Sequence, residues 1–299
     1  MLVKPRSFGY NAETAVNNAF QAAPQQAPEV VVRKAINEFD TFASRLRSKG
    51  VKVLVFEDTS TPVKPDAVFP NNWVSFHPDG TVVLYPMFAA NRRHERRADI
   101  LDELKGEYTI SRIIDLSQYE AENRFLEGTG SIVFDHISKT AFACVSPRTD
   151  EQLLKELCVA INYRPLLFHA YDHGGMLIYH TNVMMCISEN FAVICLEAIK
   201  DSKERKKIES GLAVNGREIV PITLSQINHF AGNMLAVNGS MGPLLVMSQS
   251  AANCLSARQK TTLSSHCEIL AMPIKTIETI GGGSARCMMA EVFLPEKST

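Results

Sequence analysis

The sequence predicts an α/β fold in which five ββαβ units follow one another around a single ring. Hairpin signals, which are short β-rich runs separated by Asn, Asp, Gly or Pro, recur along the chain. Each hairpin is followed by a helical pattern and then by another apolar run. The residues that precede the successive hairpins are Asn72, Gly130, Asn182, Asn233 and Arg286, at steps of 58, 52, 51 and 53 residues. This regular step leaves no linker, so we expect one domain over residues 1–299, with two α/β domains of similar size as the alternative.

The first part of the chain contains a helix, its strand and the first hairpin. One apolar helical face is formed by Ala35, Phe39, Phe42, Ala43 and Leu46. Gly50 is expected to end this helix, and residues 51–56 follow as its strand. Residues 73–76 and 81–85 form a hairpin across the turn at 77–80. Ile100, Leu101 and Leu104 mark the helix after it.

The same pattern recurs to the end of the chain. The next three hairpins join residues 131–134 to 140–145, 183–187 to 191–196, and 234–237 to 244–247. A capping box over residues 149–152 predicts the start of one helix, and residues 166–168 form the strand after it. Ile208 and Leu212 mark the following helix, and the last helical pattern begins at Asn253. Residues 287–293 are expected to form a fifth hairpin strand, which the N-terminal residues would pair with to close the ring.

Composition excludes several classes of protein. Lys and Arg number 31 and Asp and Glu number 32, so 31 − 32 gives a net charge of −1. A near-neutral chain has no electrostatic signature for binding nucleic acid or an anionic membrane. Its 45% of hydrophobic residues is enough for a large core, which excludes disorder. The most apolar window, residues 176–199, contains His, Asn and Glu side chains, which favours a buried hairpin over a membrane span.

The chain ends and the cysteines suggest a cellular compartment. The first seven residues, with Lys4 and Arg6, lack the apolar stretch of a signal peptide. No two of the seven cysteines form a Cys-x-x-Cys pair, and most stand in apolar runs. We therefore expect a cytoplasmic protein with reduced thiols, no metal site and no cofactor.

Four chemically reactive residues occupy the same segment of the repeat. Asp66, Glu127 and His180 lie seven, four and three residues before their hairpin strands, and Cys287 is the first residue of its own. In a ring of repeats this segment faces the same axis at the same end, so we expect the four side chains to meet there. Each alone has an ordinary structural explanation, such as a buried histidine, a buried thiol or an Asx turn. Their coincidence favours a functional site.

Three glycines at 281–283 deliver Cys287 next to Arg286. Glycine allows close approach of the backbone to a ligand, and a neighbouring cation favours a thiolate. A cysteine with a histidine provides a nucleophile and a proton carrier. Two carboxylates are unexpected for a cysteine peptidase but suit the planar fork of a guanidinium group.

Four segments resemble the guanidino-group-modifying pentein superfamily: residues 65–73, 127–130, 180–182 and 281–288. Its members include arginine deiminases, dimethylarginine dimethylaminohydrolases, succinylarginine dihydrolases and amidinotransferases. The chain is most similar to the bacterial branch of amidinotransferase or citrulline-utilisation hydrolases. The resemblance covers nearly the whole chain and implies a five-bladed α/β propeller.

The resemblance also implies roles for individual residues. Cys287 would be the nucleophile, His180 the general acid and then the general base, and Glu127 the group that binds guanidinium and orients His180. The implied substrate-binding residues are Asp66, Asn71, Asn72, Asn182 and Gly283. Asn72 and Asn182 stand where dimethylarginine enzymes and deiminases, respectively, have an acid. This loss of negative charge disfavours free arginine as the substrate.

We therefore expect a Cys-dependent hydrolase that cleaves a C–N bond of a small guanidino or ureido compound. The alternatives are an amidinotransferase with the same site and, less favoured, a non-catalytic pentein that acts as a binding module. Loops at 91–94 and 230–233 are candidates for contacting the rest of the substrate. We expect no nucleic-acid or membrane partner, and a homo-oligomer is left open.

Overall fold

The computed structural model describes residues 1–297 and contains five separate small sheets. One has two strands, β1 (Leu2–Lys4) and β2 (Val55–Glu57). The others have three strands each: β3 (Val74–Phe76), β4 (Thr81–Leu84) and β5 (Arg112–Asp115); β6 (Val133–Asp135), β7 (Thr140–Cys144) and β8 (Arg164–Phe168); β9 (Met185–Ile187), β10 (Phe191–Ile194) and β11 (Glu218–Pro221); β12 (Leu235–Gly239), β13 (Gly242–Ser248) and β14 (Glu268–Met272). The predicted α/β class is correct.

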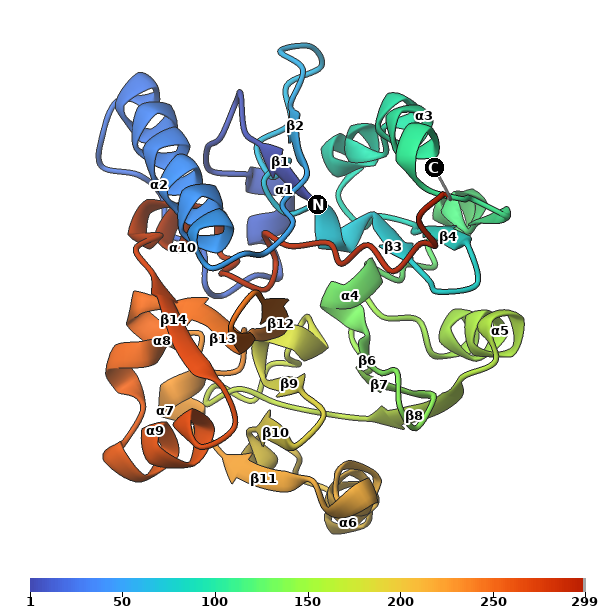
Figure 1. Cartoon of the computed structure of the whole chain (residues 1–299), viewed down its shortest axis with the longest axis vertical. Coiled ribbons are helices and arrows are strands. Elements are labelled where there is room, and N and C mark those ends of the chain that lie inside the picture. Colours follow the sequence, from blue (N-terminus) through green and yellow to red (C-terminus); the bar gives the residue numbers. More distant parts are fainter. Residues whose placement is uncertain (298–299) are drawn as a thin grey trace.

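Helices connect and cover these sheets. They are α1 (Ala12–Ala15), α2 (Pro28–Ser48), α3 (Ala98–Glu107), α4 (Gly128–Ser131), α5 (Glu151–Ile161), α6 (Ser202–Leu212), α7 (Leu224–Ile227), α8 (Gln249–Cys254), α9 (Ala257–Ser264) and α10 (Lys275–Gly281). In Figure 1 the colours pass around the molecule in chain order, with α2, α3, α5 and α6 at the periphery and the N-terminus near the centre. No helix within the described residues combines the length and the apolar character that a membrane crossing requires.

The four three-stranded sheets share one topology. Their first two strands are antiparallel and the third is parallel to the second, as in β3–β4–β5 and β6–β7–β8. The sheets formed by β9–β11 and β12–β14 repeat this arrangement. A parallel strand requires a crossover connection, and α3, α5 and α6 provide it in three of the sheets. The predicted ββαβ unit is therefore present in these four sheets.

Two local predictions are wrong. Helix α5 is capped by Asp150, whose carboxylate accepts a hydrogen bond from Leu153 N at 2.6 Å, and not by Thr149. An aspartate one residue later is an equally good cap and displaces the predicted capping box. Residues 287–293 form no strand, because turns bond the Cys287 and Met289 N–H groups to oxygens three residues earlier.

Met1 nevertheless contacts this segment. Met1 O accepts a hydrogen bond from Ala290 N at 3.0 Å, and the Met1 amino group donates to Ala290 O at 2.8 Å. β1 itself pairs with β2 in parallel, with Leu2 opposite Val55. Met1 and Ala290 therefore lie side by side, joined by two backbone hydrogen bonds rather than by the strand pairing that the sequence predicted.

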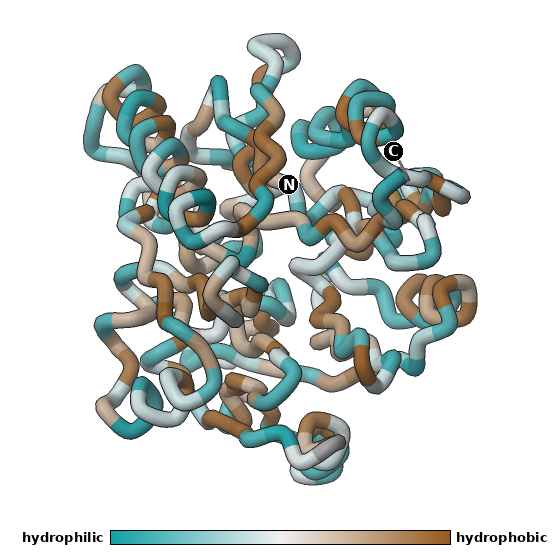
Figure 2. The backbone as a smooth tube through the Cα atoms, in the orientation of Figure 1, coloured by the Kyte–Doolittle hydropathy of each residue, from teal (hydrophilic) through white to brown (hydrophobic). Residues whose placement is uncertain are grey.

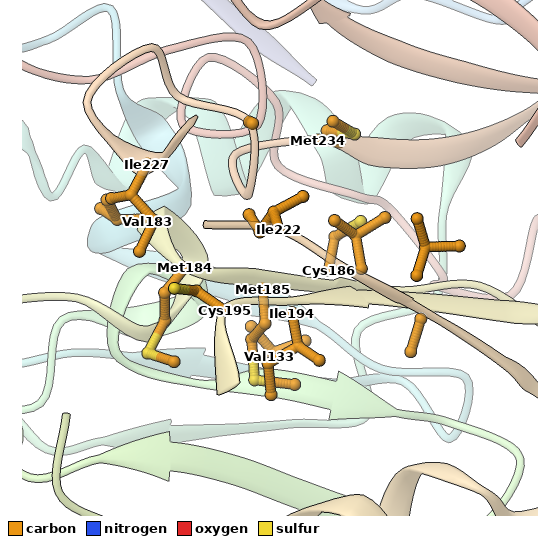
Figure 3. Close-up of a cluster of buried hydrophobic side chains, with 14 of the residues drawn as sticks. Val133, Val183, Met184, Met185, Cys186, Ile194, Cys195, Ile222, Ile227 and Met234 are labelled. Atoms are coloured by element: carbon orange, nitrogen blue, oxygen red, sulfur yellow. The ribbon is translucent and has the colours of Figure 1, made fainter. Parts of the chain in front are cut away.

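Buried hydrophobic side chains fill the space between sheets and helices. The largest cluster gathers residues of β9, β10 and their neighbours, among them Met185, Ile194 and Met234 (Figure 3). A second cluster lies under α2, where Phe39 and Phe42 are almost fully buried. Each such side chain contributes about 1.5–3 kcal/mol to folding. Hydrophilic and hydrophobic positions alternate along α2 in Figure 2, as expected for a helix with one buried face.

The segments just before the hairpins pack on one another. They are the short 3₁₀ helix η1 (Pro70–Asn72), α4, and the 3₁₀ helix η4 (Thr181–Val183). Gly128 has φ +46°, and a Cβ there would lie 2.9 Å from Asn72 O, so only glycine allows α4 to approach η1 this closely. Thr181 Oγ1 donates to Ser131 O at 2.5 Å and so joins η4 to α4. Equivalent segments of successive repeats are thereby brought into contact.

Candidate active site

A narrow polar cavity of about 20 Å³, room for about one water molecule, lies where these segments meet. It is lined by Thr14, Asn18, Asp66, Phe69, Asn72, Arg92, Arg148, Tyr179, His180, Gly281, Gly282, Gly283 and Cys287. Asp66, Asn72, His180, Gly283 and Cys287 were all predicted from the sequence. Glu127, Asn71 and Asn182 are fully buried and do not line the cavity. The structure therefore brings most of the predicted residues to one place.

His180 and Glu127 form a buried pair. The imidazole Nε2 lies 2.7 Å from Glu127 Oε2, and Phe88 N donates to Glu127 Oε1 at 2.9 Å. Burial opposes ionisation of Glu127, but Arg148 and His180 outweigh it and hold the pKa of the carboxyl far below its usual range. Since Glu127 is ionised, the ring proton of neutral His180 sits on Nε2, and Nδ1 is the free acceptor.

Burial lowers the pKa of His180 to about 4, although the hydrogen bond and the charge of Glu127 act in the opposite direction. The ring is therefore neutral at pH 7. Gly130 leaves the space that the ring occupies, because a Cβ at this position would lie 2.7 Å from His180 Nδ1. The predicted glycine segment at 127–130 thus has a steric function.

The sulfur of Cys287 is held by two asparagines. Asn233 Nδ2 lies 3.3 Å and Asn182 Nδ2 lies 3.4 Å from Sγ, and Asn233 Oδ1 lies 3.7 Å away. Among residues 1–297 no hydrogen bond joins Sγ to the His180 ring, although both side chains line the cavity. The sulfur and the imidazole therefore both face the cavity but are not paired with each other.

The residues around Cys287 only partly follow the sequence prediction. Gly283 is needed for space, because a Cβ there would lie 2.9 Å from the Phe69 ring. Arg286 does not support the sulfur as predicted. Its guanidinium donates to Met289 O at 2.8 Å and to Glu291 at 2.9 Å, and it lines a different cavity. Consecutive side chains in this turn point to different sides, so adjacency in sequence does not place the Arg286 charge on Cys287.

The carboxylate of Asp66 lines the cavity. Asn11 Nδ2 donates to Asp66 Oδ2 at 2.7 Å, and Arg92 Nε lies 3.7 Å from the same oxygen. Burial raises the pKa of Asp66 in spite of these two partners. Asp66 Oδ1 is buried and has no hydrogen-bond partner among residues 1–297. This oxygen can accept a hydrogen bond from an N–H group of a bound molecule.

The loop at 91–94 contributes one residue to the cavity. Arg92 donates to both oxygens of Glu95, at 2.9 and 2.8 Å, and to Asn72 Oδ1 at 2.9 Å. Burial raises the pKa of Glu95 to about 7, against the attraction of Arg92. In the loop at 230–233, Asn233 bonds the Cys287 sulfur, and no residue of this loop lines the cavity.

Sequence reasoning missed several lining residues. Arg148 Nη2 donates to Thr14 O at 2.8 Å, and Asn18 Nδ2 donates to Gly282 O at 3.2 Å, so residues near α1 cover the cavity. These residues carry no periodic pattern that could have revealed them. Asn233 did carry a signal, because it occupies the same repeat position as Asn72 and Asn182. Among the described residues no three His, Cys, Asp or Glu side chains are grouped to hold a metal ion.

A family model described as eukaryotic N,N dimethylarginine dimethylhydrolase matches residues 4–294. The chain belongs to this family. The resemblance to the guanidino-group-modifying superfamily is therefore confirmed. A search of curated proteins by sequence gives no match.

Solved structures of this superfamily share the fold. The chain is 17% identical to the apo structure of ArgZ, a cyanobacterial arginine dihydrolase, with a TM-score of 0.75; the match covers 97% of this chain and 40% of that one. The N-terminal domain of ArgZ bound to substrate is matched at 18% identity and a TM-score of 0.74, over 98% of both chains. An adduct of dimethylarginine dimethylaminohydrolase with S-methyl-L-thiocitrulline gives 12% identity and a TM-score of 0.66, over 96% of each chain. The chain thus spans about two fifths of full-length ArgZ and nearly all of its N-terminal domain.

Proposed function

We propose that the protein is a hydrolase that cleaves a C–N bond of a guanidino or ureido compound, with Cys287 as nucleophile. The observation that carries the proposal is the cavity lined by the Cys287 sulfur, the Glu127-bonded His180 ring and the partly unpaired Asp66 carboxylate. The family match supports the same class of reaction. The repeated sheets and the contact between Met1 and Ala290 support a single catalytic domain built as a five-bladed propeller.

A guanidinium group would bind between Asp66 and the catalytic pair. Its N–H donors match Asp66 Oδ1, which has no hydrogen-bond partner in the described part of the chain. Asn72 presents an amide to the same cavity in place of a carboxylate. Because Arg92 and Arg148 add two positive charges to the lining, we expect a substrate whose far end is anionic or whose reacting group is weakly basic.

The first half-reaction forms a covalent adduct. The sulfur of Cys287 gives an electron pair to the central carbon, and the C–S bond forms as the C=N π pair moves to nitrogen. The proton lost by the thiol is taken up at Nδ1 of His180 and passed to the departing nitrogen, so the C–N bond breaks and a neutral amine leaves. Glu127 holds Nε2–H throughout and stabilises the transient imidazolium.

The second half-reaction uses water. With the amine gone, Nδ1 of His180 accepts a proton from a water molecule as its oxygen attacks the thiouronium carbon. The C–S bond then breaks, and its electron pair returns to sulfur, which takes back a proton from Nδ1 of His180. The former water oxygen releases its second proton to solvent as the C=O bond forms, and the ureido product leaves. An amidinotransferase would differ only here, with an amine in place of water. Among the described residues that line the cavity, Asp66 is the only carboxylate, which provides no second acidic site for an incoming amine.

The test is turnover in ¹⁸O-labelled water. The panel contains arginine, N-succinylarginine, methylarginines, citrulline and guanidinoacetate, each with and without glycine or ornithine. We expect ¹⁸O in the ureido product, or in carbonate if two ammonias leave, with no dependence on an added amine. The Cys287→Ser variant is the blank. Turnover that requires the amine and leaves the label in water would instead identify an amidinotransferase. Absence of turnover and of covalent trapping would favour a binding module. Oligomeric state and cytoplasmic location stay predictions.

A further inference from the structure

We propose that Arg148 is a positioning residue, whose positive charge keeps the Glu127–His180 pair free of an extra proton so that Nδ1 of His180 can accept one. Arg148 Nη1 lies 3.4 Å from Glu127 Oε2, and the same oxygen lies 2.7 Å from His180 Nε2. One carboxylate oxygen thus connects the guanidinium to the imidazole. The inference rests on the proposed function only in assigning proton transfer to Nδ1.

The carboxyl group of Glu127 is surrounded by donors. Phe88 N donates to Oε1 at 2.9 Å, and Arg148 and the His180 ring face Oε2. A neutral carboxyl group would need an acceptor for its O–H, and among these groups only Nε2 of the ring can accept. A proton on Glu127 would therefore move the ring proton from Nε2 to Nδ1. A proton taken up by the ring would also occupy Nδ1, because imidazolium carries N–H on both nitrogens. In both cases one extra proton on the pair blocks Nδ1.

The guanidinium of Arg148 is fixed in place and almost fully buried. Its carbon lies 4.9 Å from the centroid of the Tyr179 ring and 5.8 Å from that of the Phe88 ring. Nη2 donates to Thr14 O and Nε donates to Asn17 Oδ1, both at 2.8 Å. Because solvent screens a buried charge only weakly, Arg148 acts strongly on the neighbouring pair.

Among residues 1–297, Glu127 is the only acid within ion-pair distance of Arg148. Arg92, the other cation that lines the cavity, donates to both oxygens of Glu95 at 2.9 and 2.8 Å and lies 3.7 Å from Asp66. The charge of Arg92 is therefore balanced by its own acids, whereas the charge of Arg148 is directed to the Glu127–His180 pair. The other ionisable groups that line the cavity with His180 are Tyr179 and Cys287.

The pKa shifts of the pair agree with this role. Burial lowers the pKa of His180 to about 4, and the charges of Arg148 and Arg92 act in the same direction, against Glu127. Burial opposes ionisation of Glu127, and Arg148 is the largest of the causes that lower the pKa of this carboxyl. Because the two groups share a hydrogen bond, they titrate as one unit. Removing the charge of Arg148 therefore favours proton uptake by the pair, whichever group receives the proton.

The experiment follows the ring nitrogens of His180 by ¹⁵N NMR between pH 5 and 8, in histidine-labelled protein without substrate. The spectrum of His180→Ala identifies the signals. In the wild type, Nδ1 should give the signal of an unprotonated nitrogen and Nε2 that of an N–H group. A charge within about 4–6 Å moves a pKa by about 1–3 units. In Arg148→Met the midpoint of proton uptake at Nδ1 should therefore rise from about 4 to about 5–7.

Two control variants separate the charge of Arg148 from its other contacts. Asn17→Ala removes the hydrogen bond from Nε but keeps the charge, so its spectrum should equal that of the wild type. Arg217→Met breaks a buried ion pair outside the cavity, in which Arg217 Nη1 lies 2.9 Å from Asp135 Oδ2, and should also leave the His180 signals unchanged. A general loss of stability would affect Arg217→Met as much as Arg148→Met.

An Nδ1 that stays unprotonated throughout this pH range in folded Arg148→Met overturns the proposal, as does a protonated Nδ1 in the wild type at pH 7. A shift in Asn17→Ala equal to that in Arg148→Met would assign the effect to the hydrogen bond and also overturn it. If Arg148→Met fails to fold, Arg148→Gln decides the matter, because it removes the charge but keeps an N–H donor. Since the NMR measurement needs no substrate, an absence of guanidine turnover would refute the proposed function and leave this result standing.

Discussion

Replacing Gly130 by Ala adds a single methyl group next to the His180 ring and tests whether the position of this ring matters for catalysis. The new Cβ would lie 2.7 Å from both Cε1 and Nδ1 of the ring, and closer still to Asn72 Nδ2. Ordinary contact begins near 3.4 Å, so the ring must retreat by about 3.4 − 2.7 = 0.7 Å. A displacement of this size at a catalytic group costs about 100-fold in rate. We therefore expect kcat to fall by about 100-fold, which corresponds to about 2.7 kcal/mol of barrier.

The assay combines steady-state kinetics on a compound that the wild type hydrolyses with alkylation of Cys287. Alkylation should be unchanged, because Asn182 and Asn233 hold the sulfur independently of Gly130. Gly106→Ala is the matched control. Nothing lies within 4 Å of its Cβ, and in α3 the change should stabilise the helix by roughly 0.5–1 kcal/mol. A Gly130→Ala kcat equal to that of Gly106→Ala, in a folded protein, would refute the assignment of His180 to proton transfer at this position.

Three further predictions concern proton transfer and stability. His180→Ala should lower kcat by roughly 10²–10⁴-fold in steady-state assays, and an effect on KM alone would make His180 only a binding residue. Burial lowers the pKa of His77 to about 4, so the unfolded chain takes up a proton first and stability falls as pH drops from 6.5 towards 4. Urea unfolding should show that His77 lowers the free energy of unfolding by up to about 3 kcal/mol over this pH range. In the His77→Phe variant this part of the pH dependence should be absent. Arg217→Met should cost about 3 kcal/mol in thermal or urea unfolding, because it leaves Asp135 buried without its partner at 2.9 Å, and adding Asp135→Asn should restore most of the loss.

Much of the site could be predicted from the repeat. Asp66, His180 and Cys287 come from the segments next to three different hairpin positions and line one cavity, and Glu127 bonds His180 behind its wall. The spacing of the hairpins can be read from the sequence, because short β-rich runs and the turn residues between them mark each hairpin. The predictions that proved wrong were also local. Helix α5 is capped by Asp150 instead of Thr149, and residues 287–293 begin with turns instead of a strand. Alternative hydrogen bonds between residues a few positions apart compete in both places.

The sequence by itself determined the α/β class, the order of the repeats and the set of candidate site residues, because hydrophobic periodicity and residue chemistry can be read from the order of the amino acids. Tertiary structure alone decided which groups touch the sulfur. Arg286 is adjacent to Cys287 in sequence yet pairs with Glu291, while Asn182 and Asn233 come from other repeats to bond Sγ. Side-chain direction in a turn depends on backbone angles and packing at that point. Contacts between residues 54 and 105 positions apart form only when the repeats are assembled.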